Sequence, residues 1–152
     1  MTRQFLSVTL DGRSEHDIKS VARLRSAVID QMECFVNCKR INKSVFENDD
    51  ALEIQPDPKN GRFDFTYAGT RIQFAVVAGL ASDGPSAKIR CTHEYEIAAN
   101  KISDLLGDFN LEPNGRMNFH EPSGQVCFAA HTADLIVAFY LAKAFENNLR
   151  VE

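Results

Sequence analysis

ADLIVAFYLAKAF, residues 133–145, is the stretch that the rest of this chain has to cover. With about 100° between successive helical residues, its large apolar side chains point in almost every direction. A helix that is apolar all round is normally buried on several sides. The stretch is shorter than the roughly 20 apolar residues that a membrane-spanning helix needs. We therefore expect a helix that serves as a core element, as a subunit contact, or as both.

The composition is that of a folded domain. The chain has 152 residues, of which 44% are hydrophobic and 25% are charged, and this length is sufficient for one core. A net charge of −4 argues against a nucleic-acid-binding protein, because such proteins usually carry a basic surface. The first residues lack the apolar run of a signal peptide. We expect a cytoplasmic protein with reduced cysteines, bound to no membrane.

Two hydrophobic periods alternate along the chain. A period of two predicts strands and a period of 3.6 predicts helices. Helices are expected from Ser14 to about Lys39, over 94–106 with Gly107 after its last turn, and over 133–148 with Thr132 as N-cap. Strands are expected at 4–10, 51–55, 62–67, 71–77, 88–93, 116–120 and 125–129.

The clearest strand pattern is that of residues 62–67. Phe63, Phe65 and Tyr67 fall on one face, and the polar residues between them fall on the other. Ala68-Gly69 then predicts a tight turn. The sequence as a whole predicts a single α+β domain over residues 1–152: an antiparallel sheet of five to seven strands with a long N-terminal helix, a middle helix and a C-terminal helix packed on it.

Apart from the strand at 4–10 and the fourth strand at 88–93, which are extra, this order of elements resembles the type III secretion chaperone-like fold, which runs helix, three strands, helix, two strands, helix. The matching region extends from about Ser14 to Leu149, and its second half matches best. The resemblance lies in element order and size, and no sequence motif accompanies it. Members of that family are small, often acidic and commonly dimeric, so the resemblance implies a protein-binding dimer.

Two helical surfaces are candidates for contact with a partner. On the C-terminal helix, Ile136 and Tyr140 share one edge, which we expect to face another subunit or a partner protein. On the N-terminal helix, Leu24 and Ala27 belong to a second seam of small or semi-polar residues opposite the core face. The seam consists of Ser20, Leu24, Ala27, Gln31, Cys34 and Cys38. A purely solvated face would carry more charge, so this seam also predicts a packing partner.

The candidates for chemistry are weaker than those for binding. Cys34 and Cys38 share one helical face, and together with Cys91 and His93 they could form a zinc site. Their spacing matches no standard ligand pair, and cysteine commonly packs as a small apolar residue. A nucleophilic pair of Cys91 and His93 would need hydrogen-bond contact, but alternate residues of a strand lie about 6–7 Å apart. We therefore expect no metal, no cofactor and no catalytic residue.

The leading hypothesis is a non-enzymatic protein-binding module, chaperone-like or a regulatory adaptor, that forms a homodimer. The alternative is a small enzyme or a ligand-binding protein with a pocket between sheet and helices. A pocket with converging polar groups would favour the alternative. An exposed apolar patch of several hundred Å² would favour the binding module.

Overall fold

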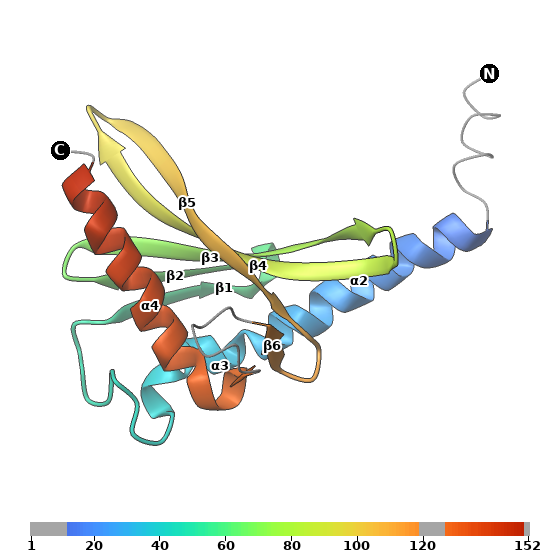
Figure 1. Cartoon of the computed structure of the whole chain (residues 1–152), viewed down its shortest axis with the longest axis horizontal. Helices are drawn as coiled ribbons and strands as arrows, with labels where there is room; N and C mark the ends of the chain where they lie inside the picture. The colour runs from blue at the N-terminus through green and yellow to red at the C-terminus, as the bar shows by residue number, and fades with distance from the viewer. Residues whose placement is uncertain (1–11, 119–126, 151–152) are drawn as a thin grey trace.

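A computed structural model describes residues 12–118 and 127–150, which form a seven-stranded antiparallel sheet and two long helices (Figure 1). The helical elements are α2 (Gly12–Gln31), α3 (Glu33–Val36), the 3₁₀ turns η1 (Cys38–Arg40) and η2 (Pro58–Asn60), and α4 (Ala129–Arg150). The strands are β1 (Glu53–Asp57), β2 (Arg62–Tyr67), β3 (Thr70–Ala81), β4 (Gly84–Ile97), β5 (Asn100–Leu111), β6 (Arg116–Asn118) and β7 (Cys127–Phe128).

The sheet is a simple meander in which each strand pairs with the next one along the chain. The spatial order is β1 to β7, and every neighbouring pair is antiparallel. This arrangement confirms the predicted α+β class and the antiparallel sheet. In Figure 1 the far end of the β3–β4 hairpin runs beside α2, and the tip of the β4–β5 hairpin rises beside the C-terminal end of α4.

The helices cover one face of the sheet. Phe74 of β3 lies at the centre of that face, and its ring contacts Phe35 of α3 at 5.5 Å and Tyr140 of α4 at 5.7 Å between centroids. The predicted alternation in β2 is confirmed, because Phe63 and Phe65 are buried. The opposite face is polar: there Asp64 of β2 accepts hydrogen bonds from Arg71 and Gln73 of β3, both at 2.8 Å.

The N-terminal helix occupies the predicted region but is not continuous to Lys39. α2 ends at Gln31, a turn at Met32 leads into the short α3, and η1 follows from Cys38. The buried side chains of Met32, Phe35 and Cys38 keep this broken segment on the core. The predicted strand at 4–10 lies outside the described residues, as do 119–126, which include parts of the two strands expected at 116–120 and 125–129.

The predicted middle helix over 94–106 is wrong. Residues 94–97 end β4, residues 100–106 belong to β5, and Ala98-Ala99 form the turn between them. The φ angles of these two alanines are 51° and 69°, the left-handed conformation required at both central positions of a type I′ hairpin turn. Alanine is the strongest helix former, so this turn carries none of the usual asparagine or glycine signals. The element order expected from the chaperone-like resemblance is therefore not the order observed.

The Ala98-Ala99 turn can be tested through the free energy of unfolding, because a turn and a helix predict changes of opposite sign. We expect Ala98→Asn with Ala99→Gly to raise the free energy of unfolding by about 1 kcal/mol, because both new residues accept positive φ more readily than alanine. If this segment were helical, the glycine would instead cost about 1 kcal/mol. Ala22→Gly, in the exposed middle of α2, is the matched helical control and should be destabilising. Urea denaturation measures all three chains.

Two capping predictions are also corrected. Gly107 follows no helix; it lies in β5, beside the bulge in the β4–β5 register. A Cβ atom at Gly107 would lie 3.2 Å from the ring of Tyr140, so the glycine gives α4 room to approach the sheet. α4 begins at Ala129 rather than at Ala133, and the Thr132 hydroxyl donates back to the carbonyl of Phe128 at 2.9 Å.

Candidate functional site

The predicted binding edge of the C-terminal helix lies inside the molecule. Ile136 is 1% exposed and Tyr140 is 2% exposed. The ring of Tyr140 packs against Phe74 of β3 and against Phe109 of β5, and burial raises its pKa well above the usual range. The sequence-based prediction that this edge faces a partner is therefore wrong for the single chain. Both residues hold α4 onto the sheet.

The second seam of the N-terminal helix is used in part within the chain. Leu24 is half-buried and packs against the core, and Ala27 is also half-buried. Further along the seam, the amide nitrogen of Gln31 donates to the Pro113 carbonyl at 2.7 Å. Cys38 at its end is buried. Packing within one subunit therefore accounts for much of the uncharged character that predicted a partner.

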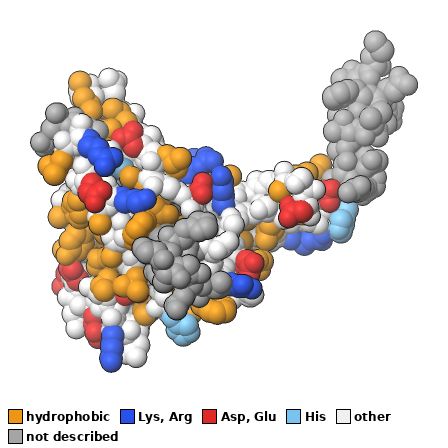
Figure 2. All heavy atoms as spheres, in the orientation of Figure 1, with side chains coloured by type: hydrophobic (Ala, Val, Ile, Leu, Met, Phe, Trp, Pro, Cys, Tyr) orange, Lys and Arg blue, Asp and Glu red, His pale blue; other side chains and the backbone are white. Residues whose placement is uncertain are grey.

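The opposite side of α4 carries an apolar surface that faces solvent. Its residues follow one another at alternating steps of four and three, and we call them the outer stripe. They are Phe128, which ends β7, and then Thr132, Leu135, Phe139, Ala142, Glu146 and Leu149 of α4. The large apolar members are exposed by 48% (Phe128), 47% (Leu135), 39% (Phe139) and 77% (Leu149), and Phe145 beside them is 37% exposed. Figure 2 shows hydrophobic side chains gathered on the side of the molecule where α4 lies.

Interactions at both ends of α4 keep the outer stripe in place. Near its start, the buried carboxylate of Asp134 accepts a hydrogen bond from the Val45 backbone amide at 3.0 Å. Further along, the Lys143 ammonium lies 4.8 Å from the centroid of the Phe139 ring and donates to the Leu106 carbonyl at 3.4 Å. The outer stripe thus lies on a helix that is attached to the loop before β1 and to β5.

A polar cluster attaches the C-terminal half of α4 to the β4–β5 hairpin. The Asn147 amide nitrogen lies 2.9 Å from a carboxylate oxygen of Asp104 and 2.8 Å from Nδ1 of His93. The Tyr95 hydroxyl donates to the same carboxylate oxygen at 2.6 Å. Because the Asp104 carboxylate can only accept hydrogen bonds, the NH₂ group of Asn147 must face it. The same NH₂ group donates to Nδ1 of His93, so Nδ1 is an acceptor and carries no proton. The structure therefore favours neutral His93 with its proton on Nε2.

The pKa shifts in this cluster have simple physical causes. Burial lowers the pKa of His93, and the nearby carboxylates of Asp104 and Glu94 oppose this change only in part. Hydrogen bonds from Tyr95 and Asn147 hold the pKa of Asp104 below its usual value. The bond between the Tyr95 hydroxyl and Asp104 also raises the pKa of Tyr95. His93 is buried, whereas Tyr95, Asp104 and Asn147 are partly exposed, and the cluster clamps α4 onto the β4–β5 hairpin.

The clamp predicts a pH dependence of stability. Because the pKa of His93 is lower in the folded than in the unfolded chain, the unfolded chain binds its proton more readily. The stability that neutral His93 provides is complete above the unfolded pKa of about 6.5 and is lost as the pH falls from there through the folded pKa. We expect the free energy of unfolding to decrease over this range.

The matched variants for this test are His93→Gln and His16→Gln. His93→Gln should remove the decrease in the free energy of unfolding below about pH 6.5. His16→Gln, at an exposed position of α2, should keep that decrease. Chemical denaturation at a series of pH values makes the measurement. Equal slopes in the wild-type and His93→Gln chains would contradict the assignment.

The cysteines do not assemble a metal site among the described residues. Cys34, Cys38 and Cys91 are free thiols, and across 12–118 and 127–150 no three His, Cys, Asp or Glu side chains are placed to hold an ion. Burial raises the pKa of Cys38 to about 11 and that of Cys91 well above its usual value. High thiol pKa values oppose thiolate formation, which both metal binding and nucleophilic attack require.

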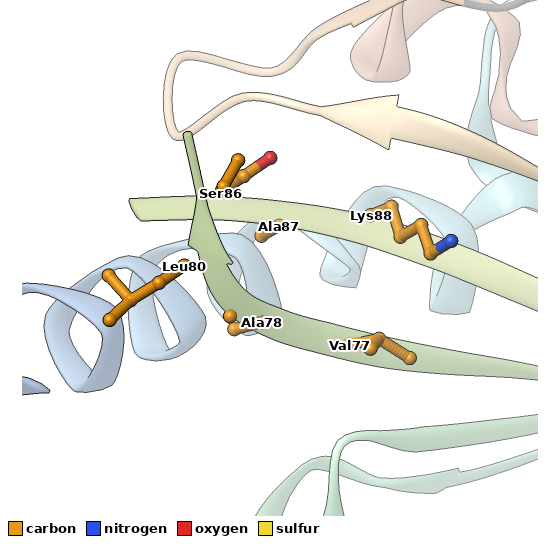
Figure 3. Close-up of a pocket in the computed structure, with 8 residues that line it drawn as sticks. Val77, Ala78, Leu80, Ser86, Ala87 and Lys88 are labelled. Atoms are coloured by element: carbon orange, nitrogen blue, oxygen red, sulfur yellow. The ribbon is translucent and has the colours of Figure 1, made fainter. Parts of the chain in front are cut away.

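Aromatic rings fill the centre of the space between sheet and helices. Phe35, Phe74, Phe109 and Tyr140 contact one another there, with centroids 5.5–6.2 Å apart. A cavity of about 370 Å³ remains between α2–α3 and β1–β2, and it is lined by Ile29, Asp30, Glu33, Val36, Pro56, Pro58 and Phe63. A hollow of about 350 Å³ lies elsewhere, near the end of the β3–β4 hairpin (Figure 3). Its labelled side chains are Val77, Ala78, Leu80, Ser86, Ala87 and Lys88. The Lys88 ammonium lies 3.3 Å from a carboxylate oxygen of Asp108.

The outer stripe was visible in the sequence as a 4-3 spacing over 128–149, but an expected helix start at Ala133 concealed its first two members. Among the described helices, none has both the length and the apolar character needed to cross a membrane. No protein-family model, no curated protein and no solved structure matches this chain.

Proposed function

We propose that this protein is a non-enzymatic protein-binding module, chaperone-like or a regulatory adaptor, that works as a homodimer. The observation that carries the proposal is the outer stripe of α4. Large exposed apolar patches on soluble proteins commonly mark interaction sites. Full burial of one large apolar side chain contributes about 1.5–3 kcal/mol, so covering the stripe would supply substantial binding free energy.

The rest of the molecule supports binding over chemistry. The rings around Phe74 fill the centre of the region in which the alternative function would place a ligand pocket, and the cavity that remains beside Val36 and Phe63 has a mainly apolar lining. His93 and Cys91, which combine the side-chain types of a nucleophilic pair, are both buried. We therefore favour the binding module over an enzyme or a ligand-binding protein.

The test is the mass of the protein in solution. Light scattering should give twice the 17.0 kDa of one chain at micromolar concentration. Leu135→Asp with Phe139→Ser should yield a folded monomer, because both residues are exposed in the single chain. Thr66→Ala with Gln73→Ala, on the polar face of the sheet, is the control and should remain dimeric. A wild-type chain that is monomeric at all practical concentrations would overturn the homodimer.

A further inference from the structure

The outer stripe becomes self-complementary when two copies of α4 run in opposite directions. We propose that α4 pairs with α4 of a second copy in this antiparallel manner, with Phe139 of both copies at the two-fold axis. This inference rests on the proposed function, because it names the partner of the same surface and the way in which that partner binds. The arrangement follows from spacing, side-chain size and charge.

The spacing of the stripe favours a helix as the occupant. Alternating steps of four and three place its six helical residues, from Thr132 to Leu149, at the core positions of a heptad pattern, the pattern by which one helix packs along another. The stripe extends from Phe128, just before α4, to Leu149 in its last turn. A partner helix as long as α4 itself would therefore cover it.

Side-chain size favours the antiparallel direction. With Phe139 at the axis, Leu135 lies opposite Ala142 of the second copy. Large residues then meet small ones in the layers next to the axis, where alternation of large and small side chains gives good packing. In a parallel pair Ala142 would face Ala142 and leave a gap in the core of the seam.

Charge favours the same direction. A parallel pair would bring Glu146 of one copy against Glu146 of the other, and like charges at such a position repel. In the antiparallel pair Glu146 lies opposite Thr132 instead. The two helix dipoles also run in opposite directions in this pair, so that each helix end lies near an end of opposite partial charge.

The exposed area fits a dimer with an apolar centre and a polar rim. From their exposed fractions, the three phenylalanines Phe128, Phe139 and Phe145 together present roughly 200–300 Å². Leu135 and Leu149 enlarge the patch to several hundred Å², as is found for functional patches. A standard interface buries about 800 Å² on each partner, so the polar residues that flank the stripe would provide the remainder.

Cysteine cross-linking on the full chain tests the direction. In a background of Cys34→Ser and Cys127→Ser, single cysteines are placed at positions 135, 139, 142 and 105 and treated with a short bis-maleimide. We expect Phe139→Cys to form a covalent dimer alone, and Leu135→Cys to do so only when it is mixed with Ala142→Cys. The mixture leaves Phe139 intact, so it remains informative if the axis variant dissociates. Leu105→Cys, exposed on β5, is the control outside the stripe and should not cross-link.

The outcomes separate this inference from the proposed function. Efficient self-cross-linking of Leu135→Cys and of Ala142→Cys, without a gain on mixing, would show a parallel pair and overturn the antiparallel arrangement. A dimer by light scattering without cross-links at any α4 position would overturn the inference and leave the homodimer standing. A monomeric wild-type chain would contradict both the antiparallel pair and the proposed homodimer. If the expected cross-links form, the double variant Leu135→Asp and Phe139→Ser should raise the Kd of the dimer at least about 100-fold.

Discussion

Ile136→Asp with Tyr140→Ser is expected to unfold the chain, whereas Leu135→Asp with Phe139→Ser leaves it folded. The first pair is buried against the sheet and the second is exposed, although the two pairs are neighbours on one helix. An aspartate at position 136 would bury a charge without a partner, which costs several kcal/mol. Removal of the Tyr140 ring adds about 3–5 kcal/mol, and together these losses equal or exceed the stability of a typical domain.

Far-UV circular dichroism and urea denaturation of the two double variants make this comparison. The inner variant should lose its helical signal and its cooperative transition, and the outer variant should keep both. A folded inner variant would mean that α4 does not pack on β3 and β5 through Tyr140 and would contradict the described fold. An unfolded outer variant would mean that the stripe serves the core of one subunit, and the binding proposal would lose its basis.

Phe74→Ala is expected to lower the free energy of unfolding by about 3–5 kcal/mol, because a buried aromatic ring leaves a cavity. The ring of Phe74 contacts Phe35, Phe65, Phe109 and Tyr140, so this residue joins α3, α4 and the sheet. We expect a loss of similar size for Phe65→Ala, since that residue is also fully buried.

Thr66→Ala is the matched control for this second prediction. Thr66 follows Phe65 in β2 but points to the polar face of the sheet, so its replacement should cost less than about 1 kcal/mol. Urea denaturation of the three variants gives the comparison. Equal losses at positions 65 and 66 would mean that another layer covers the polar face, and the description of the sheet as open on one side would be wrong.

Local patterns sufficed where a segment had only one reasonable conformation. The alternating residues of β2 identified a strand with one buried face, and Ala68-Gly69 identified the turn to β3. The antiparallel character followed from short connections between strands, which leave no room for crossovers. The apolar residues 133–145 identified a buried helix, because they could not all remain in water without loss.

Local patterns failed at residues 94–106, because the residues of this segment fit both a helix and a β-hairpin. Tyr95, Ala98 and Ile102 have helical spacing, but in the structure Tyr95 and Ile102 are cross-strand partners. The long ladders from β3 to β4 and from β4 to β5 outweigh the helix propensity of Ala98-Ala99 and hold both alanines at positive φ. Propensities of a few tenths of a kcal/mol per residue cannot compete with the pairing of whole strands.

By itself the sequence determined the class of the protein: an antiparallel α+β domain with a strongly apolar C-terminal helix. The tertiary structure alone decided which side of that helix is core and which is surface. Apolar residues surround α4, so no single face is marked until the sheet, with Phe74 and Phe109, covers one side. The side with Ile136 and Tyr140 then becomes interior, and the outer stripe is left in solvent, because a helix can bury only the faces for which the rest of the chain supplies a surface.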